Sequence, residues 1–453
     1  MSLSTADVAH LLIALAVLLI ATHACGSLFA SARQPRVIGE IAGGLLLGPT
    51  VLGAIAPRVQ SWLFPAGGVT AAALRIVYEL GLLLLMFCTG VQIRAAFRRE
   101  ESRAVAWISL TGLLLPVLAG LAFLRVIDLR SLWGPSADRT SFALVFAIAV
   151  AVTSIPVISR IMHDLGILDT AFARIVLGVA VVEDVVLYVV LAIALGIASS
   201  GADAFGIPAA IGLVPGTALD AAYHVLVSVG TLWLFLGPGR RLYPRIAASR
   251  FNVLHRRSPV AHQLLFMLAS TIACLALGVE AFFGAFLAGI AVAASPDPAR
   301  AVGAPEPRDG AETSAIQSFA FAFFIPLYFG LVGFQLDLRS GFDPWFFLGF
   351  AAFACAAKGL SVYAGARLAS ETSGSSLNLA VAMNARGGPG IVLASVAYAA
   401  GVVDQPFYAA LVMLAVVTSL IAGSWLQRVP RDRLLERPGT PRTERRPAGR
   451  SAG

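Results

Sequence analysis

The stretch Ile175–Gly196 reads IVLGVAVVEDVVLYVVLAIALG, and it indicates the fold class of the whole chain. Around the adjacent acids Glu183 and Asp184, its side chains are aliphatic or small apart from one tyrosine. A helix needs about 20 apolar residues to cross the hydrocarbon layer. Without water in that layer, only helices and closed barrels satisfy their backbone hydrogen bonds. The stretch shows no alternation of polar and apolar residues, so it predicts a membrane-spanning helix with two acids near its middle.

Apolar runs of this kind recur along the chain. Of its 453 residues, 58% are hydrophobic and only 13% are charged, whereas a soluble domain carries about 25% charged residues. We therefore expect an all-α membrane protein with about thirteen transmembrane helices. The expected helices cover residues 8–30, 37–56, 73–93, 104–126, 141–162, 170–198, 218–237, 260–278, 281–295, 314–336, 344–367, 376–399 and 404–427.

The arginines divide the connecting loops into basic and arginine-poor ones. The basic loops are 33–36, 94–103, 240–257 and 300–308. The net charge of +8 therefore does not indicate nucleic acid binding, because positive charge in alternate loops orients membrane helices. This bias predicts cytoplasmic basic loops, an external N-terminus and a cytoplasmic C-terminus, in the cell (inner) membrane. Residues 429–453 are rich in Arg, Pro, Gly and Thr, so we expect a disordered basic tail.

Two of the expected spans contain a break. Residues 142–159 read FALVFAIAVAVTSIPVIS, with Pro156 in mid-run after Thr153 and Ser154. Proline removes a backbone donor and disfavours helical geometry in the residue before it. Residues 379–398 read LAVAMNARGGPGIVLASVAY and contain the second break. Its polar and helix-breaking residues are Asn384, Arg386, Gly387, Gly388 and Pro389.

The two breaks lie at matching places in the chain. If residues 8–198 and 260–427 are two repeats joined by a linker helix over 218–237, each break falls in the fifth span of its repeat. The odd number of crossings between them makes the repeats inverted, and paired breaks of this kind point to a transporter's binding site. The alternative is that proline and glycine only kink these helices, as they often do in membranes. We expect residues 1–428 to form one transmembrane domain.

Among the ionisable side chains inside expected spans, Glu183, Asp184 and Lys358 are the strongest candidates for function, since placing each there costs at least about 2.5–3.5 kcal/mol. Glu183 and Asp184 point about 100° apart on a helix, so one can face the site while the other meets a neighbouring helix. Lys358 is the only lysine among 33 Lys and Arg residues, and a buried lysine, unlike arginine, can lose its proton. The alternatives are a structural acid pair bonded only to other helices and a simple buried ion pair.

A carboxylate in a dry site can hold either a proton or a desolvated monovalent cation. Sodium and potassium suit oxygen ligands such as carboxylates, hydroxyls and backbone carbonyls. Asp184, Thr153 and Ser154 therefore form a chemically sensible shell, with Asp184 as ligand to a monovalent cation only. No cofactor is expected.

Seven stretches of the chain also resemble sequences of a known protein family. They are Val37-IGEIAGGLLLGP, Leu80-GLLLLMFCTGVQI, Val152-TSIPVISRIMHDLGILDT, Val181-VEDVVLY, Phe283-GAFLAGI, Phe324-IPLYFGLVGFQLDL and Met383-NARGGPGIVLA. Because these stretches occur in this order, the chain resembles the monovalent cation:proton antiporter-2 family, which has the sodium/proton exchanger fold. The resemblance extends over nearly all of residues 8–427.

The resemblance implies a homodimer with a static dimerisation domain and a mobile core that moves like an elevator. The core would comprise the fourth to sixth and the eleventh to thirteenth spans. Asp184 falls at the position of the family's main ion and proton ligand. Glu183 falls at the first position of the acid pair, which is commonly Asp, Asn or Gln, and this departure leaves the stoichiometry open. Lys358 falls where the family's core lysine often pairs with that first acid.

These observations lead us to expect a secondary active antiporter that exchanges Na⁺ or K⁺ for protons. Glu183 and Lys358 would balance the charge at Asp184. The alternatives are a channel-like potassium efflux protein that is not coupled to protons, and an organic-anion carrier or sensor on the same fold. An enzyme is not expected, since no catalytic constellation lies outside the expected spans.

Overall fold

The computed structural model describes residues 4–32, 34–92, 102–154, 158, 161–162, 165, 167, 170–199, 206–212, 217–237, 239–249, 252–293, 311–339 and 342–430. These residues form helices, and their β pairing is confined to a single isolated bridge. The predicted all-α fold class is therefore confirmed. The predicted tail over 429–453 lies outside the described residues, except for its first two positions.

The helices follow the apolar runs along the chain. They are α1 Thr5–Ser31, α2 Arg36–Leu47, α3 Leu52–Ile55, α4 Pro57–Leu63, α5 Gly68–Gln92, α6 Ser102–Val126, α7 Arg139–Ala151, α9 Ala171–Ser199, α10 Ile207–Ala210, α11 Ala218–Leu236, α12 Gly239–Ala248, α13 Val253–Arg257, α14 Pro259–Ala276, α15 Ala281–Ala293, α16 Ala311–Phe319, α17 Ile325–Phe334, α18 Pro344–Leu368, α19 Ser373–Ala382, α20 Gly387–Ala399 and α21 Gln405–Arg428, with the short turns η3 Arg130–Leu132 and η6 Ala320–Phe324.

Helices long and apolar enough to cross a membrane occur throughout the described part of the chain. Ten candidate spans meet this standard, and α7, α15 and residues 219–235 of α11 are shorter apolar helices. Each of the expected spans overlaps at least one of these helices. The chain is therefore a multi-pass membrane protein, while the number of crossings stays a prediction.

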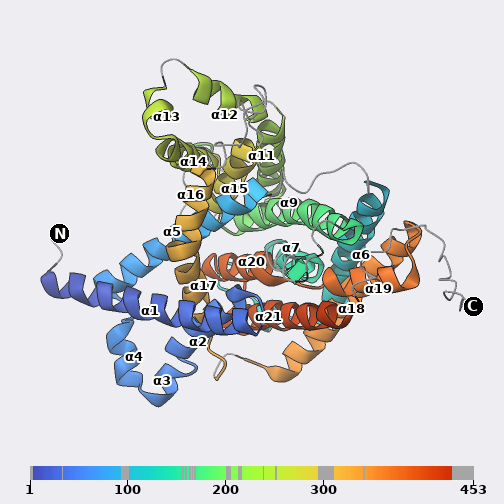
Figure 1. Ribbon diagram of the computed structural model, residues 1–453, viewed down its shortest axis with the longest axis horizontal. Coiled ribbons are helices and arrows are strands. Elements are labelled where there is room, and N and C mark those ends of the chain that lie inside the picture. The colour runs from blue at the N-terminus through green and yellow to red at the C-terminus, as the bar shows by residue number, and fades with distance from the viewer. Residues whose placement is uncertain are drawn as a thin grey trace, which may run out of the picture.

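The helices pack in two groups (Figure 1). In the first group, α1, α2, α5, α14, α15 and α17 pack on one another. In the second group, α6, α7 and α9 pack with α18, α19, α20 and α21. The linker α11 packs mainly against α9 and also against α15, so it contacts both groups. The predicted core and dimerisation domains divide along the same line, and that division stays a prediction.

Glycines allow very close packing in the first group. A Cβ at Gly43 would overlap the carbonyl of Ala21 on α1, and a Cβ at Gly44 would overlap the carbonyl of Gly330 on α17. In a membrane no hydrophobic force drives helices together, so their association depends on close packing, which small residues allow. Helix α2 therefore fits between α1 and α17 only because its facing positions lack side chains.

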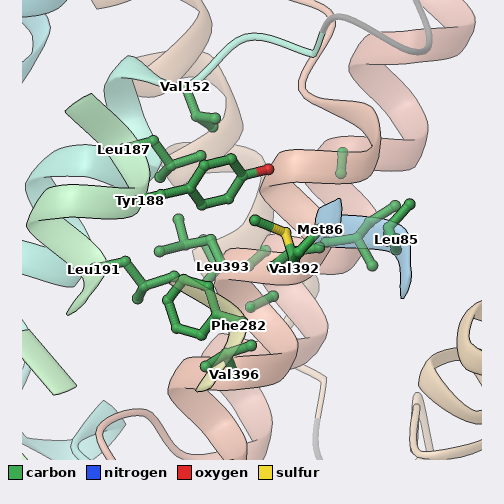
Figure 2. Packing of buried hydrophobic residues seen from close by; sticks show 14 of the residues in the cluster. Leu85, Met86, Val152, Leu187, Tyr188, Leu191, Phe282, Val392, Leu393 and Val396 are labelled. Carbon is green, nitrogen blue, oxygen red and sulfur yellow. The ribbon is translucent and has the colours of Figure 1, made fainter. Parts of the chain in front are cut away.

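A layer of buried apolar side chains lies between the two groups (Figure 2). Tyr188 on α9 contacts Phe282 and Phe286 on α15, with ring centroids 6.2 and 4.8 Å apart. Met86 of α5 and Leu393 of α20 belong to the same buried cluster. This layer begins one helical turn beyond the acid pair on α9, so buried apolar side chains follow the acids on that side.

Both predicted helix breaks are present, but their positions differ from the expectation. Helix α7 ends at Ala151, and Val152 is already extended, with φ −64° and ψ 144°. The first break therefore begins before Pro156, which lies outside the described residues.

The second break occupies residues 383–386, between α19 and α20. The glycine–proline run was expected to interrupt the helix, but Gly387, Gly388 and Pro389 instead form the first turn of α20. Proline is tolerated in a first turn, because its missing N–H would have no intrahelical acceptor there. Gly387 has a positive φ of 26°, which favours glycine where α20 begins.

Candidate ion-binding site

The two helix breaks are hydrogen-bonded to each other. The hydroxyl of Thr153 donates to the carbonyl oxygen of Met383 at 2.6 Å. The backbone N–H of Ser154 donates to the carbonyl oxygen of Ala385 at 2.7 Å. Each break therefore supplies partners for backbone or side-chain groups of the other, and the two unwound segments meet in the interior of the protein.

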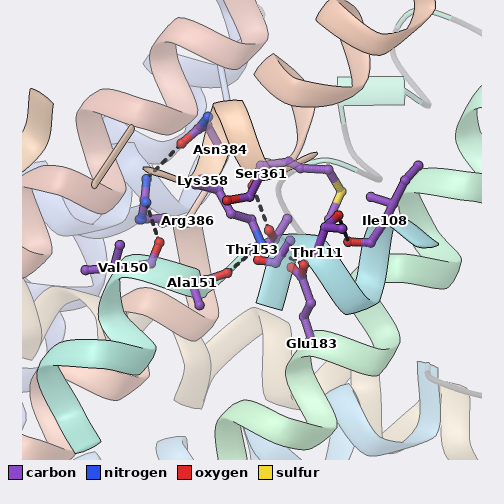
Figure 3. Close-up of polar contacts among 12 residues, drawn as sticks. Ile108, Thr111, Val150, Ala151, Thr153, Glu183, Lys358, Ser361, Asn384 and Arg386 are labelled. Carbon is purple, nitrogen blue, oxygen red and sulfur yellow. Dashed lines mark hydrogen bonds and ion pairs between the residues drawn. The ribbon is translucent and has the colours of Figure 1, made fainter. Parts of the chain in front are cut away.

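Two cations cover the end of α7 at this crossing (Figure 3). The last carbonyls of a helix lack intrahelical donors and carry a partial negative charge. Arg386 donates to the carbonyl oxygens of Ala149 at 3.3 Å and Val150 at 2.9 Å. Lys358 donates to the carbonyl oxygen of Ala151 at 2.6 Å. The interrupted helix thus ends inside the protein with its final carbonyls satisfied by side chains.

Arg386 also joins the break to the rest of the second group. Its guanidinium is almost fully buried and donates to the carbonyl oxygen of Ala354 on α18 at 2.9 Å and to Asn384 Oδ1 at 3.2 Å. A planar guanidinium with five donors in fixed directions suits such a set of acceptors. The sequence placed Asn384 and Arg386 at the crossing, but it gave no indication that backbone carbonyls are the main acceptors of Arg386.

Lys358 and Glu183 form a buried ion pair. Lys358 Nζ lies 2.6 Å from Glu183 Oε1, and both side chains are at most 1% exposed. The ammonium also donates to the carbonyl oxygen of Gly112 on α6 at 2.9 Å. The structure thus contains the pair that the resemblance implies, and the ammonium links four helices: α6, α7, α9 and α18.

Asp184 lies beside this pair and differs from it in one respect. Its side chain is fully buried, yet neither carboxyl oxygen has a hydrogen-bond partner among the described residues. Glu183 Oε2 and Ser154 Oγ are also buried without a partner. Buried polar groups are nearly always hydrogen-bonded, and an isolated buried carboxylate is very costly. The carboxyl oxygens can therefore accept a proton, and together with the hydroxyl oxygen they can coordinate a small cation.

The start of α20 has partners that the sequence analysis missed. The N–H groups of Arg386 and Gly387 donate to Thr418 Oγ1 at 3.3 Å and to Ser419 Oγ at 3.2 Å, respectively. Two adjacent hydroxyl residues within the apolar run of α21 were the available signal. Their position shows that α21 holds the second break in place through side-chain hydrogen bonds.

The fold and the buried charges define the class of the protein: a polytopic membrane protein with a carboxylate site where two interrupted helices cross. Residues 13–431 match the family described as "Sodium/hydrogen exchanger, transmembrane". The chain belongs to this family. Proteins similar to it are named as cation/H(+) and Na(+)/H(+) antiporters, which are transporters and not enzymes.

Relatives with assigned names come from plants, bacteria and yeast. Cation/H(+) antiporter 20 of Arabidopsis thaliana is 27% identical over 91% of this chain and 47% of its own length. Na(+)/H(+) antiporter NhaS4 of Synechocystis is 25% identical over 89% of this chain and 93% of its own length. K(+)/H(+) antiporter 1 of Saccharomyces cerevisiae is 26% identical over 89% of this chain and 44% of its own length. The chain thus spans about half the length of the plant and yeast relatives.

A solved structure shows the same fold. The sodium proton antiporter MjNhaP1 from Methanocaldococcus jannaschii matches 92% of this chain and 97% of its own chain with a TM-score of 0.62. The sequence identity is 14%, so this comparison concerns the arrangement of the helices alone.

Proposed function

We propose that the chain is a secondary active antiporter that exchanges Na⁺ or K⁺ for protons. The observation that carries the proposal is Asp184, a fully buried carboxyl with no hydrogen-bond partner among the described residues. Such a carboxyl is stable when it is protonated or when it binds a cation, and it cannot do both at once. Competition between the two ligands for one group couples their transport.

In this proposal the groups around Asp184 have distinct roles. Ser154 Oγ and Glu183 Oε2 are unpartnered and complete the oxygen shell for a desolvated cation. Thr153 orients the crossing through its bond to Met383. Lys358 holds the other oxygen of Glu183 and balances its charge. The relatives include both a Na(+)/H(+) and a K(+)/H(+) antiporter by name, which supports a monovalent cation as the substrate.

The same proposal includes an elevator-type movement within a homodimer. The site residues lie on α9 and α18, in the break that follows α7 and in the α19–α20 break, all in one packing group, so that group can move as a unit carrying the ion. The other group, built around the close contacts of α2, would be the static dimerisation domain. The protein would lie in the cell membrane, with the basic loops and the C-terminus in the cytoplasm.

The experiment is cation-induced proton movement in everted membrane vesicles with an imposed acid-inside gradient and a pH-sensitive dye. Sodium, potassium and lithium are added in turn to wild type, to Asp184→Asn and to Asp128→Asn. Asp128 is a matched control, because it is an exposed loop acid. We expect at least one cation to collapse the gradient in wild type and in the control, but not in Asp184→Asn.

Two results would contradict the proposal. Exchange by Asp184→Asn at the wild-type rate would refute the site. A cation flux in wild type without any change in proton gradient, in well-expressed protein over a range of pH, would favour the uncoupled efflux alternative.

A further inference from the structure

The segment between α11 and α14 forms two short helices at the membrane surface. Helix α11 ends at Leu236 and α14 begins at Pro259. Helix α14 is a candidate membrane span, and residues 219–235 of α11 form a shorter apolar helix. The connecting helices α12 and α13 therefore lie at one face of the bilayer, and Figure 1 shows them together at one end of the molecule beside α11 and α14. They belong to neither the ion site nor the helix crossing.

Packing against α14 fixes the orientation of these two helices. Tyr243 of α12 is buried, with its ring centroid 5.3 Å from that of His262 and 5.0 Å from that of Phe266, both on α14. Asn252 caps α13 by accepting from the N–H of His255 at 2.9 Å. The same side chain donates to the carbonyl oxygen of Ile246 at 2.9 Å, which ties α13 to α12.

Apart from the buried Tyr243, these two helices carry exposed cations and exposed apolar side chains. Arg245, Arg256 and Arg257 are exposed, and none forms an ion pair with another described residue. Beside them, Val253 is 57% exposed, and Ile246 and Leu254 are at least one-third exposed. Helices that combine arginines with exposed aliphatic residues lie in the interface between lipid headgroups and acyl chains.

The charge of the segment is of one sign. Residues 239–257 contain six arginines, and there is no Asp or Glu anywhere from residue 221 to residue 279. Clusters of four to eight basic residues beside a membrane helix attract anionic lipids. We propose that the outer surface of α12 and α13 binds anionic phospholipid headgroups. Lipid is favoured over an acidic protein segment, because the exposed apolar side chains lie at the membrane face and need an apolar phase beside the arginines.

The alternative is that these arginines only orient the protein during its insertion into the membrane. Arginines that only orient the chain would bind no lipid once it is folded. Each basic residue near an anionic surface contributes about a fivefold gain in binding, so three of them contribute about a hundredfold. This attraction also falls as salt is raised, since the Debye length shortens from about 10 Å at 0.1 M to about 3 Å at 1 M.

The test uses the full chain in nanodiscs of phosphatidylcholine alone or with 30% phosphatidylglycerol, compared by hydrogen–deuterium exchange over residues 239–257. The test variant is Arg245→Gln/Arg256→Gln/Arg257→Gln. The control is Arg36→Gln/Arg103→Gln/Arg428→Gln, which removes three exposed arginines from other segments on the same predicted membrane face. Binding of phosphatidylglycerol and phosphatidylcholine to detergent-solubilised protein is counted by native mass spectrometry.

Phosphatidylglycerol is expected to slow exchange in residues 239–257 of wild type and of the control, and not in the test variant. In detergent, phosphatidylglycerol should bind wild type about a hundredfold more tightly than the test variant, and phosphatidylcholine should not distinguish them. Equal loss of binding in test and control variants would overturn the proposal, because lipid binding would then depend only on the net charge of the protein. So would unchanged exchange in both lipid mixtures, or protection that requires an added acidic peptide instead of lipid.

Discussion

Replacing Lys358 with Met should destabilise the protein more than replacing its partner Glu183 with Gln. The ammonium of Lys358 donates to Glu183 Oε1, to the carbonyl oxygen of Ala151 and to that of Gly112, at 2.6, 2.6 and 2.9 Å. Methionine has similar length but no donor, so it leaves a buried carboxylate without a counter-charge and two carbonyls without this donor. Removing one partner of a buried ion pair costs about 3–5 kcal/mol.

Glu183→Gln is a milder change. The amide oxygen can still accept from Lys358, and the ammonium keeps its two carbonyl acceptors. The loss is the charge-assisted part of one hydrogen bond, about 1–3 kcal/mol. The double variant Lys358→Met/Glu183→Gln leaves neither member of the pair charged, and neutral replacements of a buried pair are often tolerated. We therefore expect the double variant to be more stable than Lys358→Met alone, with a coupling free energy of about 1–3 kcal/mol.

The assay is reversible unfolding of the purified protein by titration with sodium dodecyl sulfate, followed by tryptophan fluorescence. Arg339→Met serves as the control for losing a cation, since Arg339 is exposed, and its effect should stay within about 0.5 kcal/mol. Equal losses in the two single variants, with a strictly additive double variant, would refute the reasoning, because they would show that the two side chains do not act as a pair.

Three further predictions concern other parts of the molecule. Gly44→Ala should cost about 1–3 kcal/mol or more in unfolding free energy, because its Cβ overlaps the Gly330 carbonyl; Gly349→Ala, open on α18, should stabilise by about 0.5–1 kcal/mol. Arg386→Lys should lose about 2–4 kcal/mol in the same assay, because a lysine cannot reach all acceptors of the guanidinium; wild-type stability would contradict this role. Burial raises the pKa of Glu371, in the loop between α18 and α19, above its ordinary value. Folding then favours the protonated form, so wild type should lose stability as pH rises through that pKa. Glu371→Gln should lack this loss in melting curves between pH 4 and 8, and identical pH profiles would contradict it.

The long apolar helices were predictable, because length and apolarity along the chain decide whether a segment can cross the bilayer. Short helices such as α12 and α13 were not. The presence of both breaks was predictable from local residues as well. Their limits were not, because proline and glycine can begin a helix as well as end one. At residues 383–386, Thr153 takes up the carbonyl oxygen of Met383. At the end of α7, Arg386 takes up those of Ala149 and Val150.

The two acids and the lysine of the candidate site were named from the sequence, but the hydrogen-bond partners of the site residues were not. Glu183 and Lys358 are 175 positions apart, and only the resemblance to a known family suggested their pairing. The acceptors of Arg386 are backbone carbonyls, which every residue possesses, so no sequence pattern identifies them. The approach of Gly44 to Gly330 depends likewise on tertiary packing. The roles assigned to Asp184 and Ser154 stay predictions.

The most direct measurement of the central claim is the number of protons released when a cation binds to the purified protein in weakly buffered detergent solution. If Asp184 binds either ligand, adding the transported cation to wild type releases protons, and the apparent affinity for the cation falls as the pH is lowered. Asp184→Asn should release none, while its unfolding curve shows a folded protein. Proton release by Asp184→Asn equal to that of wild type, or a cation affinity that does not change with pH, would contradict the account.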